Sequence, residues 1–457
     1  MSASVPPGSG SPGSRAPASS APLPGAWAAR LEAAGQAHLV AHAATLPGPA
    51  RAAFVAETEE IAWERLARTL RVPLPPPPPD LRPPEALTLR RQQNEPGLPR
   101  RLSALGASLL AEGQVATVLL AGGQGSRLGH PGPKGTFVLG PTPDRTLYAV
   151  LLERVLAAGR RAGRPVPVVV LVSRDTEAAT REAFATADTF GHDPALVRFV
   201  RQGELPALDD AGHAILAAPG RLALAPDGHG GLVTALEREG TFAWLEGLGV
   251  ELLTTFQVDN PLGRPLDPVF LGWCVERKAV AAGKAVRKRD PGEKVGVYAR
   301  GIDGRVRIVK YSELPEGGAP DLVLGSIAVH AFSLAWIRAL LADPAFALPL
   351  HRARKKVMCL GPDGQVAVPA ARSAIKLEQF LFDLLPAAPR VAVMEVDRAR
   401  EFAPVKNAEG EDSPATARAL VAAEIARWHR AAGRALPDPL PGLHPLDADG
   451  PADLRSA

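Results

Sequence analysis

The residues with the clearest chemical meaning lie in a glycine-rich segment at residues 120–129, which reads Leu-Ala-Gly-Gly-Gln-Gly-Ser-Arg-Leu-Gly. Glycines allow a backbone to approach a ligand closely, and successive free N–H groups in such a turn bind anions. Arg127 lies within the segment and Lys134 follows it after Pro133, so two positive charges stand beside the turn. Because arginine binds phosphate oxygens in pairs and lysine acts as a point charge, we expect this loop to hold a triphosphate.

The spacing of these residues excludes two familiar phosphate-binding loops. A P-loop requires a lysine directly after its last glycine, and no glycine of this segment is followed by lysine. A dinucleotide-binding fingerprint has the pattern G-x-G-x-x-G, whereas Gly123, Gly125 and Gly129 follow G-x-G-x-x-x-G. A glycine-rich turn that serves chain geometry alone is the remaining alternative, and the two nearby cations argue against it.

Two aspartates are candidate metal ligands. Asp259 follows an apolar run at residues 250–258, and open α/β sheets bind ligands at the carboxyl ends of their strands. A carboxylate there can bind Mg²⁺, which takes one or two carboxylates together with substrate phosphates. A turn or a helix cap before Pro261 is the alternative for Asp259. Asp227, within Pro-Asp-Gly, is either a second ligand or only a turn residue.

The elements that must position these residues alternate between strands and helices. Short apolar runs with β-branched residues predict buried parallel strands at residues 115–120, 166–172, 196–200 and 250–258. Helical spacing occurs between them at residues 147–162, 176–187 and 232–248. This alternation predicts an α/β fold with a doubly wound sheet. Glycine-containing turns between residues 285 and 329 predict an antiparallel extension, which makes the sheet mixed.

Outside this core the sequence pattern changes. Residues 27–70 have helical spacing, and a proline run follows at residues 72–80. Later segments predict a helix at residues 377–385, a strand at residues 390–396 and a helix at residues 414–434. The predicted organisation is a disordered tail (1–24), a helical cap with a Pro-rich linker (25–101), a main domain (102–385), a C-terminal α+β region (386–436) and a second disordered tail (437–457).

Composition excludes several classes of protein. The 457 residues are 46% hydrophobic and 22% charged, as in ordinary globular proteins. Two cysteines exclude a disulfide scaffold and a multi-cysteine zinc site, and they favour a reducing, cytoplasmic location. There is no transmembrane-length apolar run and no signal peptide pattern, and the net charge of +4 is too small to indicate nucleic-acid binding. We expect neither a membrane nor a nucleic acid as partner, and we interpret the basic run at residues 351–356 as a solvated surface.

The glycine-rich segment followed by Pro-Lys resembles the signature of eukaryotic-type UTP–sugar-1-phosphate uridylyltransferases, and the chain is most similar to the UDP-N-acetylglucosamine pyrophosphorylases among them. The resemblance extends from about residue 27 to residue 434. Further motifs similar to those of the family occur in the same order, at residues 36–39, 202–206, 225–231, 258–260, 293–296, 311–313, 375–378, 382–383 and 402–407. Several motifs in the right order are far more specific than any one of them.

This resemblance implies a nucleotide-diphospho-sugar transferase core of the GT-A type, with UTP and a sugar 1-phosphate as substrates and Mg²⁺ or Mn²⁺ as cofactor. It implies catalytic roles for Arg127, Lys134 and Lys406, metal binding by Asp259 and Asp227, and sugar binding by Lys310 and Ser326. It implies nucleotide binding by Leu120, Ala121, Gly122, Gly123, Gly125, Gln202, Gly228 and His229, with the amide of Gln202 reading uracil.

Three positions depart from the family pattern near the expected sugar and nucleoside. The family usually has Glu, Asn and Asn where this chain has Lys310, Ser326 and His229. Lysine has no hydrogen-bond acceptor and serine is shorter than asparagine. The resemblance implies N-acetylglucosamine 1-phosphate as the substrate, and these departures make glucose or galactose 1-phosphate the alternative.

Other classes of protein are also considered. A sugar-nucleotide sensor without activity is a second alternative, but such a protein would have lost the predicted catalytic residues. A glycosyltransferase that uses a finished UDP-sugar would not need a triphosphate loop, and a nicotinamide oxidoreductase would need a different glycine spacing. The sequence does not indicate an oligomeric state.

Overall fold

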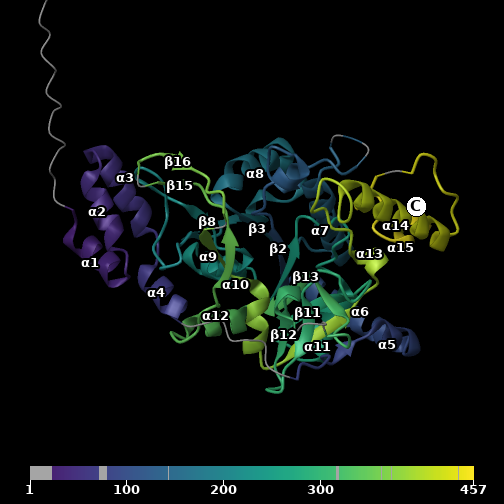
Figure 1. Ribbon diagram of the computed structural model, residues 1–457. Helices are drawn as coiled ribbons and strands as arrows, with labels where there is room; N and C mark the ends of the chain where they lie inside the picture. The colour runs from purple at the N-terminus through teal and green to yellow at the C-terminus, as the bar shows by residue number, and fades with distance from the viewer. Residues whose placement is uncertain are drawn as a thin grey trace, which may run out of the picture. The chain divides into compact units, whose positions relative to one another are not determined.

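The computed structural model describes residues 23–71, 80–140, 142, 144–314, 319–361, 363–371, 373–440 and 442–456 (Figure 1). Most of the predicted N-terminal tail and of the proline run lies outside these residues. The chain divides into two compact units. The first combines the described residues up to 71 with Glu204–Ala225 and Arg352–Leu377, and the second combines residues 80–203 with Pro226–His351 and the described residues from Glu378 onward.

The first unit begins with helices α1 (Gly25–Ala33), α2 (Ala37–Thr45), α3 (Gly48–Glu59) and α4 (Trp63–Arg71). Its later segments contain short strands: β5 (Glu204–Pro206), β6 (Leu216–Ala218), β7 (Arg221–Leu222), β8 (Leu224–Pro226), β14 (His351–Lys355), β15 (Cys359–Leu360), β16 (Val366–Ala367) and β17 (Ala374–Glu378). Gln36 connects the helices to one of these segments. Its amide oxygen accepts a hydrogen bond from Ala214 N–H at 2.8 Å, and its amide nitrogen donates to Gly212 O at 3.0 Å.

The second unit is built on a mixed sheet with the strand order β1–β18–β10–β13–β9–β2–β3–β4, extended by β11 and β12. These strands are β1 (Ala86–Leu87), β2 (Val115–Leu120), β3 (Val168–Val172), β4 (Val197–Arg201), β9 (Leu252–Gln257), β10 (Ala281–Arg287), β11 (Val297–Arg300), β12 (Val306–Val309), β13 (Leu324–Ser333) and β18 (Val391–Glu395). Strands β9, β2, β3 and β4 are parallel, whereas β13 is antiparallel to β9 and β10. The predicted mixed sheet, with its antiparallel extension, is confirmed.

Helices cover both faces of this sheet because β2 and its neighbours bury side chains on both faces. Val115 and Leu119 pack with one set of helices, and the alternate residues Ala116 and Val118 pack with another. The first set is α6 (Gly97–Ala111), α7 (Leu147–Ala162), α8 (Arg174–Thr186) and α11 (Pro268–Glu276), and the second is α9 (Leu232–Arg238), α10 (Thr241–Gly247) and α12 (Leu334–Ala342). In Figure 1, β2 lies between α7 on one side and α9 and α10 on the other. The fold is doubly wound, as predicted.

The remaining helices of the second unit are α5 (Leu89–Asn94), α13 (Arg398–Glu401), α14 (Pro414–Ala432) and α15 (Pro451–Ser456). The prediction of a helix at residues 377–385 is wrong. The chain there leaves β17 and forms a 3₁₀ segment, Leu381–Ala387, that contains Pro386. The leucines of this segment have helical spacing and are buried, but the proline cannot donate the backbone hydrogen bond that a longer helix requires.

Two further expectations differ from the structure. The single helix predicted at residues 232–248 is divided into α9 and α10 at Gly240, whose φ of +64° breaks the helical backbone. The disorder predicted for residues 437–457 is wrong for the residues described there. Asp449 is buried and accepts a hydrogen bond from Arg154 at 2.9 Å, and α15 follows. The Pro-rich composition of this stretch is typical of disorder and does not indicate that Asp449 is buried.

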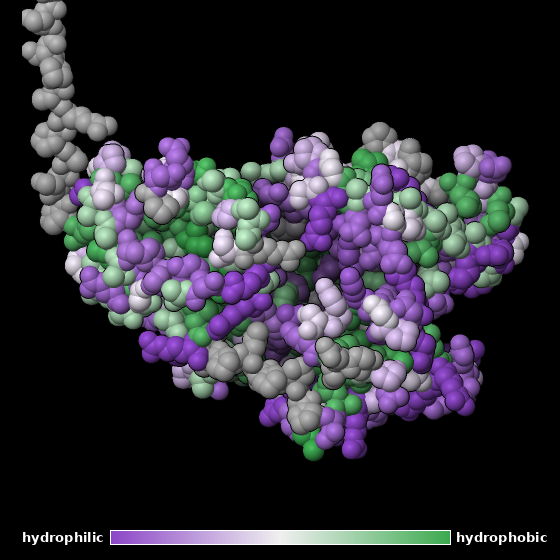
Figure 2. Space-filling model, viewed as in Figure 1, coloured by the Kyte–Doolittle hydropathy of each residue, from purple (hydrophilic) through white to green (hydrophobic). Residues whose placement is uncertain are grey.

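The surface of the molecule is mainly polar on the side shown in Figure 2, where hydrophilic residues predominate and hydrophobic residues form smaller areas between them. Among the residues that the structure describes, no helix is both long and apolar enough to cross a membrane.

Candidate active site

The predicted triphosphate loop follows β2 directly and lies in the second unit. Leu120 and Ala121 are buried at the end of the strand. The loop then folds back on itself, because Lys134 N–H donates a hydrogen bond to Gly123 O at 3.0 Å. A Cβ added at Gly123 would have no heavy atom within 4 Å, so the backbone there is accessible to a ligand.

The middle of the loop is compact. Arg127 lies in an exposed 3₁₀ turn, Ser126–Leu128, which ends at Gly129 with a φ of +68°. That left-handed conformation favours glycine. A Cβ added at Gly125 would lie 2.8 Å from the Cβ of His130, so a larger residue would force the turn open. The glycines at these two positions therefore maintain the turn that presents Arg127.

Lys134 and Asp259 come together at the carboxyl ends of two adjacent strands. β2 and β9 are parallel, and Leu120 pairs with Gln257 at their ends. The Lys134 ammonium lies 3.6 Å from Asp259 Oδ2, and the two side chains are 14% and 13% exposed. A cation and a carboxylate, both reachable from solvent, thus stand beside the open backbone of Gly123. This is the end of the sheet at which open α/β folds bind ligands.

The two candidate metal ligands have different surroundings. Within the described part of the chain, no three or more His, Cys, Asp and Glu side chains are grouped to hold a metal ion. Asp259 alone suits Mg²⁺, which binds one or two carboxylates and takes its other ligands from phosphates and water. Asp227 is buried, and its carboxylate lies in a space that exists because Gly203 and Gly231 lack side chains. A Cβ at these glycines would lie 2.6 Å and 2.1 Å from its oxygens.

The predicted nucleoside residues lie on two loops next to the glycine-rich segment. Gln202 is buried, and its amide would lie only 3.0 Å from a Cβ at Gly122, so the absence of a side chain at Gly122 makes room for the amide. Gly228 has a φ of +85°, and a Cβ there would lie 2.5 Å from Gln379 O. Gln379 was not selected from the sequence, although its N–H donates to Asp227 O at 2.7 Å and its carbonyl accepts from Gly230 N–H at 2.9 Å.

His229, the residue that replaces the usual asparagine, is tied to the chain itself. Its Nδ1 accepts a hydrogen bond from Leu381 N–H at 3.1 Å, and its ring lies 5.3 Å from that of Phe380. Burial lowers the pKa of His229 to about 4, so the ring is neutral at pH 7. A neutral imidazole that accepts at Nδ1 carries its proton on Nε2, which leaves one donor for a ligand.

The predicted sugar residues are also held by neighbours. The Lys310 ammonium lies 3.1 Å from Glu313 Oε1 and 4.9 Å from the centre of the Phe380 ring. Ser326 Oγ accepts a hydrogen bond from Ala328 N–H at 3.2 Å. Phe380 contacts both His229 and Lys310, and so places the nucleoside loop and the predicted sugar residue beside one another.

His351 differs from the solvated basic run in which the sequence placed it. It is buried, and its Nε2 lies 2.8 Å from Asp383 Oδ2 while its Nδ1 lies 3.6 Å from Glu313 Oε1. Burial opposes a positive charge on this ring, but the hydrogen bond to Asp383 and the nearby carboxylate of Glu313 outweigh it and raise the pKa of His351. No local pattern in the sequence indicates this contact, because Asp383 is 32 residues away.

Lys406 approaches the same strand end from the C-terminal region. Val405 N–H donates to Asp259 O at 2.8 Å, so the residue before Lys406 is fixed to the residue that carries the candidate metal ligand. The Lys406 ammonium lies 3.3 Å from Asp412 Oδ2 and its side chain is 38% exposed. The structure therefore brings Lys134, Asp259 and the backbone of Lys406 to one place.

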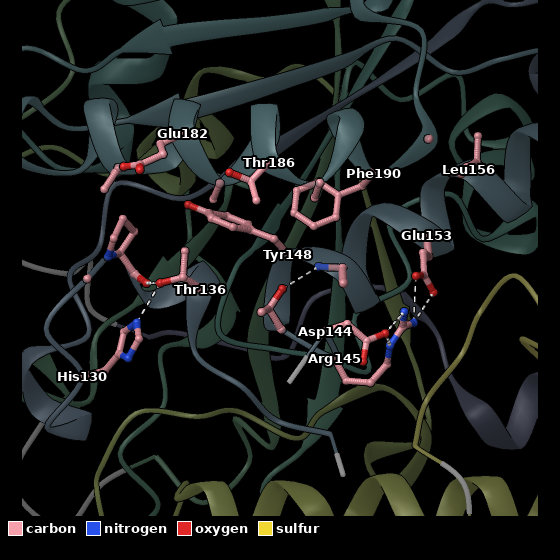
Figure 3. Close-up of a pocket in the computed structure, with 18 of the residues that line it drawn as sticks. His130, Thr136, Asp144, Arg145, Tyr148, Glu153, Leu156, Glu182, Thr186 and Phe190 are labelled. Carbon is pink, nitrogen blue, oxygen red and sulfur yellow. Dashed lines mark hydrogen bonds and ion pairs between the residues drawn. The ribbon is translucent and has the colours of Figure 1, made fainter. Parts of the chain in front are cut away.

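A cavity of about 920 Å³, lined by residues 130–133 just after the glycine-rich loop and by residues of α7 and α8, is distinct from this place. Figure 3 shows His130 and Thr136 at one end of it, Arg145 and Glu153 at the other, and the ring of Tyr148 between them. None of the residues predicted to bind the nucleotide, the sugar or the metal lines this cavity.

Comparison with known proteins identifies the family. The family model described as UTP–glucose-1-phosphate uridylyltransferase matches residues 100–439. The chain belongs to this family. The human protein named UDP-N-acetylhexosamine pyrophosphorylase-like protein 1 is 38% identical, over 92% of this chain and 89% of its own length. UDP-N-acetylglucosamine diphosphorylase 1 of Arabidopsis thaliana is 35% identical, over 74% of this chain and 70% of its own.

Solved structures of this family resemble the chain as well. The uridine diphosphate N-acetylglucosamine pyrophosphorylase of Trypanosoma brucei, solved in complex with an inhibitor, has a TM-score of 0.76 and 28% sequence identity over 89% of this chain and 85% of its own. The putative UDP-N-acetylglucosamine pyrophosphorylase of Entamoeba histolytica has a TM-score of 0.74 and 26% identity over 82% of this chain and 96% of its own. These likenesses agree with a nucleotidyltransferase core.

Proposed function

We propose that this chain is a nucleotidyltransferase that joins the uridylyl group of UTP to a sugar 1-phosphate and releases pyrophosphate. The observation that carries this proposal is the meeting of Lys134 and Asp259, 3.6 Å apart, beside the open backbone of Gly123. A cation and a carboxylate at neighbouring strand ends suit a triphosphate and its metal ion. Membership of a uridylyltransferase family supports the same reaction.

In the proposed reaction, a phosphate oxygen of the sugar 1-phosphate attacks the α-phosphorus of UTP in line with the departing pyrophosphate. No side chain has to act as a nucleophile, because positioning and charge stabilisation supply most of the catalysis in transfers of this kind. Arg127 and Lys134 would neutralise the triphosphate and the departing pyrophosphate. Lys406 would bind the incoming phosphate, after exchanging its ion pair with Asp412 for that phosphate.

A divalent cation, Mg²⁺ or Mn²⁺, would be held by Asp259, with Asp227 as the second predicted ligand. The surroundings of Asp259 fit such an ion, because its carboxylate is partly exposed at the strand end where phosphates would supply the other ligands. A bound ion of this kind would neutralise phosphate charge. Asp227 is buried, and its carboxylate lies beside Gly203 and Gly231.

The nucleoside would be read by Gln202, whose amide offers a donor and an acceptor to uracil. Gly122 and Gly228 would support the nucleoside pocket, since a Cβ at Gly122 would crowd the Gln202 amide and a Cβ at Gly228 would meet Gln379 O. His229 would contribute the Nε2–H that its hydrogen bond from Leu381 N–H leaves free to donate to the ligand.

We propose N-acetylglucosamine 1-phosphate as the sugar substrate, on the basis of the relatives' names. Lys310 and Ser326 favour glucose or galactose 1-phosphate as the second candidate, because they replace an acceptor and a longer amide. We also propose a cytoplasmic location, which is supported by the two cysteines being free. No nucleic acid or membrane partner is part of the proposal.

The test is pyrophosphate release from UTP and Mg²⁺ with four sugar 1-phosphates: N-acetylglucosamine, N-acetylgalactosamine, glucose and galactose. We expect release with N-acetylglucosamine 1-phosphate, and we expect Lys134→Ala to lower it at least about a hundredfold, because removing a single charge-stabilising donor from an active site costs this much. Release with glucose or galactose 1-phosphate alone would identify these sugar phosphates as the substrates in place of N-acetylglucosamine 1-phosphate. UTP binding without any release would favour the non-catalytic sensor.

A further inference from the structure

Lys284 is a fully buried lysine outside the predicted site. It lies on β10, none of its side chain is exposed, and its ammonium is 2.9 Å from Asp267 Oδ2 and 2.7 Å from Glu401 Oε2. Asp267 caps α11, because its Oδ1 accepts a hydrogen bond from Val269 N–H at 3.0 Å. A buried charge needs such partners, and apolar side chains of similar volume often fill the same space at least as favourably. Filling the core therefore does not explain why charged side chains, and not apolar ones, occupy this space.

The segment that Glu401 begins leads directly to Lys406. Glu401 ends the short helix α13, and its side chain is only 10% exposed. The next residues run alongside the end of β9, where Val405 N–H donates to Asp259 O at 2.8 Å. Lys406 follows immediately. The position of the Lys406 backbone thus depends on how residues 401–405 lie against the strand end.

Asn260 holds the same segment from the other side. It is buried, its Nδ2 donates to Glu401 O at 2.8 Å, and its Oδ1 accepts from Ala403 N–H at 2.9 Å. Both ends of one amide are therefore used to fix two backbone groups of the segment. Since Asn260 directly follows Asp259, the candidate metal ligand and the Lys406 segment share one support.

We propose that Glu401 is a positioning residue for the transfer reaction: gripped by Lys284 through its side chain and by Asn260 through its carbonyl, it sets the spacing between Lys406 and Asp259. This inference rests on the proposed function, because it requires Lys406 and Asp259 to act on the substrates. Reaction rates in such sites are sensitive to displacements of about 1 Å, which can cost about a hundredfold. The ion pair between Lys284 and Glu401 would serve to position Lys406 and not to increase the stability of the fold.

The variant that tests this is Glu401→Gln, which keeps the shape of the side chain and removes its charge. Lys284 retains Asp267 as a partner, so we expect the variant to fold. The matched control is Glu153→Gln. Glu153 is 12% exposed, close to the 10% of Glu401, and it pairs with a single cation, Arg145, at 2.8 Å. It contacts none of residues 401–406 in the interactions described for it.

We expect Glu401→Gln to lower kcat about 10- to 100-fold while KM for UTP changes less than about threefold, because binding of UTP does not depend on the displaced segment. Glu153→Gln should leave kcat within about twofold even if both variants lose similar thermal stability. A second variant, Asn260→Ala, removes the two backbone hydrogen bonds without changing any charge, and it should lower kcat in the same way.

The possible failures are distinguishable. Wild-type protein that releases no pyrophosphate from any sugar 1-phosphate would refute the proposed function, and with it this inference. Active wild-type protein with an unchanged kcat in folded Glu401→Gln or Asn260→Ala would refute the inference alone. An equal loss of kcat in Glu153→Gln would also overturn it, because the effect would then follow stability and not position.

Discussion

Replacing His330 by leucine should remove one component of the pH dependence of folding. His330 lies on β13 and is 1% exposed, opposite Thr255 of β9 and Gly283 of β10. Burial, together with the nearby His229, lowers its pKa from 6.5 to about 3. Leucine is apolar and similar in size, so the variant keeps the core filled while removing the titrating group.

The sign and size of the effect follow from the two pKa values of His330. Above pH 6.5 the ring is neutral in both folded and unfolded chains, so it adds no pH dependence. Below pH 6.5 the unfolded chain binds a proton that the folded chain does not, and the free energy of unfolding decreases as pH falls until the folded pKa is reached. Between pH 7 and pH 5 this one proton corresponds to a loss of about 2 kcal/mol.

The assay is urea unfolding of the wild-type protein and His330→Leu at pH 7, 6 and 5, followed by tryptophan fluorescence. Other titrating groups are shared by the two proteins, so their contributions cancel in the difference between the free energies of unfolding. We expect the free energy of unfolding of the wild-type protein, minus that of the variant, to decrease by about 2 kcal/mol from pH 7 to pH 5. A difference that stays constant across this range would refute the reasoning, because it would mean that the folded chain already accepts the proton.

Two further predictions test the loop and the sugar site. Gly135→Ala should lower the free energy of unfolding by about 1 to 3 kcal/mol, because its Cβ would lie 2.1 Å from the buried ring of Tyr148. Gly123→Ala is the control, and both variants are compared by urea unfolding. No heavy atom lies within 4 Å of a Cβ at Gly123, so this variant should leave the free energy of unfolding nearly unchanged. An equal loss in both variants would contradict the packing described for these two glycines. Ser326→Asn should raise the ratio of kcat/KM for N-acetylglucosamine 1-phosphate to that for glucose 1-phosphate about tenfold, because the longer amide can reach an N-acetyl group and still accept from Ala328 N–H. Pyrophosphate release at low substrate measures this ratio, and an unchanged ratio would remove Ser326 from the sugar site.

The central sheet and one part of the site could be predicted from the sequence. The apolar, β-branched runs became β2 and β3, and glycine-containing turns marked the antiparallel strands. Asp259 and Lys134 meet because parallel strands end at the same edge of a sheet, which is a consequence of local pattern and topology. Their predicted roles in metal and phosphate binding stay predictions.

The interactions between distant segments could not be predicted. His351 pairs with Asp383, which is 32 residues away, and Lys284 pairs with Glu401, which is 117 residues away. No local pattern shows which carboxylate will meet which cation. Asp449 lies in a Pro-rich stretch whose composition indicates disorder, and its ion pairs with Arg154, Arg161 and Arg264, which are 295, 288 and 185 residues away, fix it in place. Because the tertiary structure determines the partner of a buried charged side chain, the role of that side chain cannot be inferred before the fold is known.

The most direct test of the account follows the oxygen that joins the two phosphates of the product. N-acetylglucosamine 1-phosphate with ¹⁸O in its phosphate is incubated with unlabelled UTP and Mg²⁺, and both products are analysed by mass spectrometry. If the sugar phosphate attacks the α-phosphorus of UTP, all of the label appears in the UDP-sugar and the pyrophosphate carries none. Label in pyrophosphate, or no UDP-sugar from any sugar 1-phosphate of the panel, would contradict the proposed transfer at the site formed by Lys134, Asp259 and Lys406.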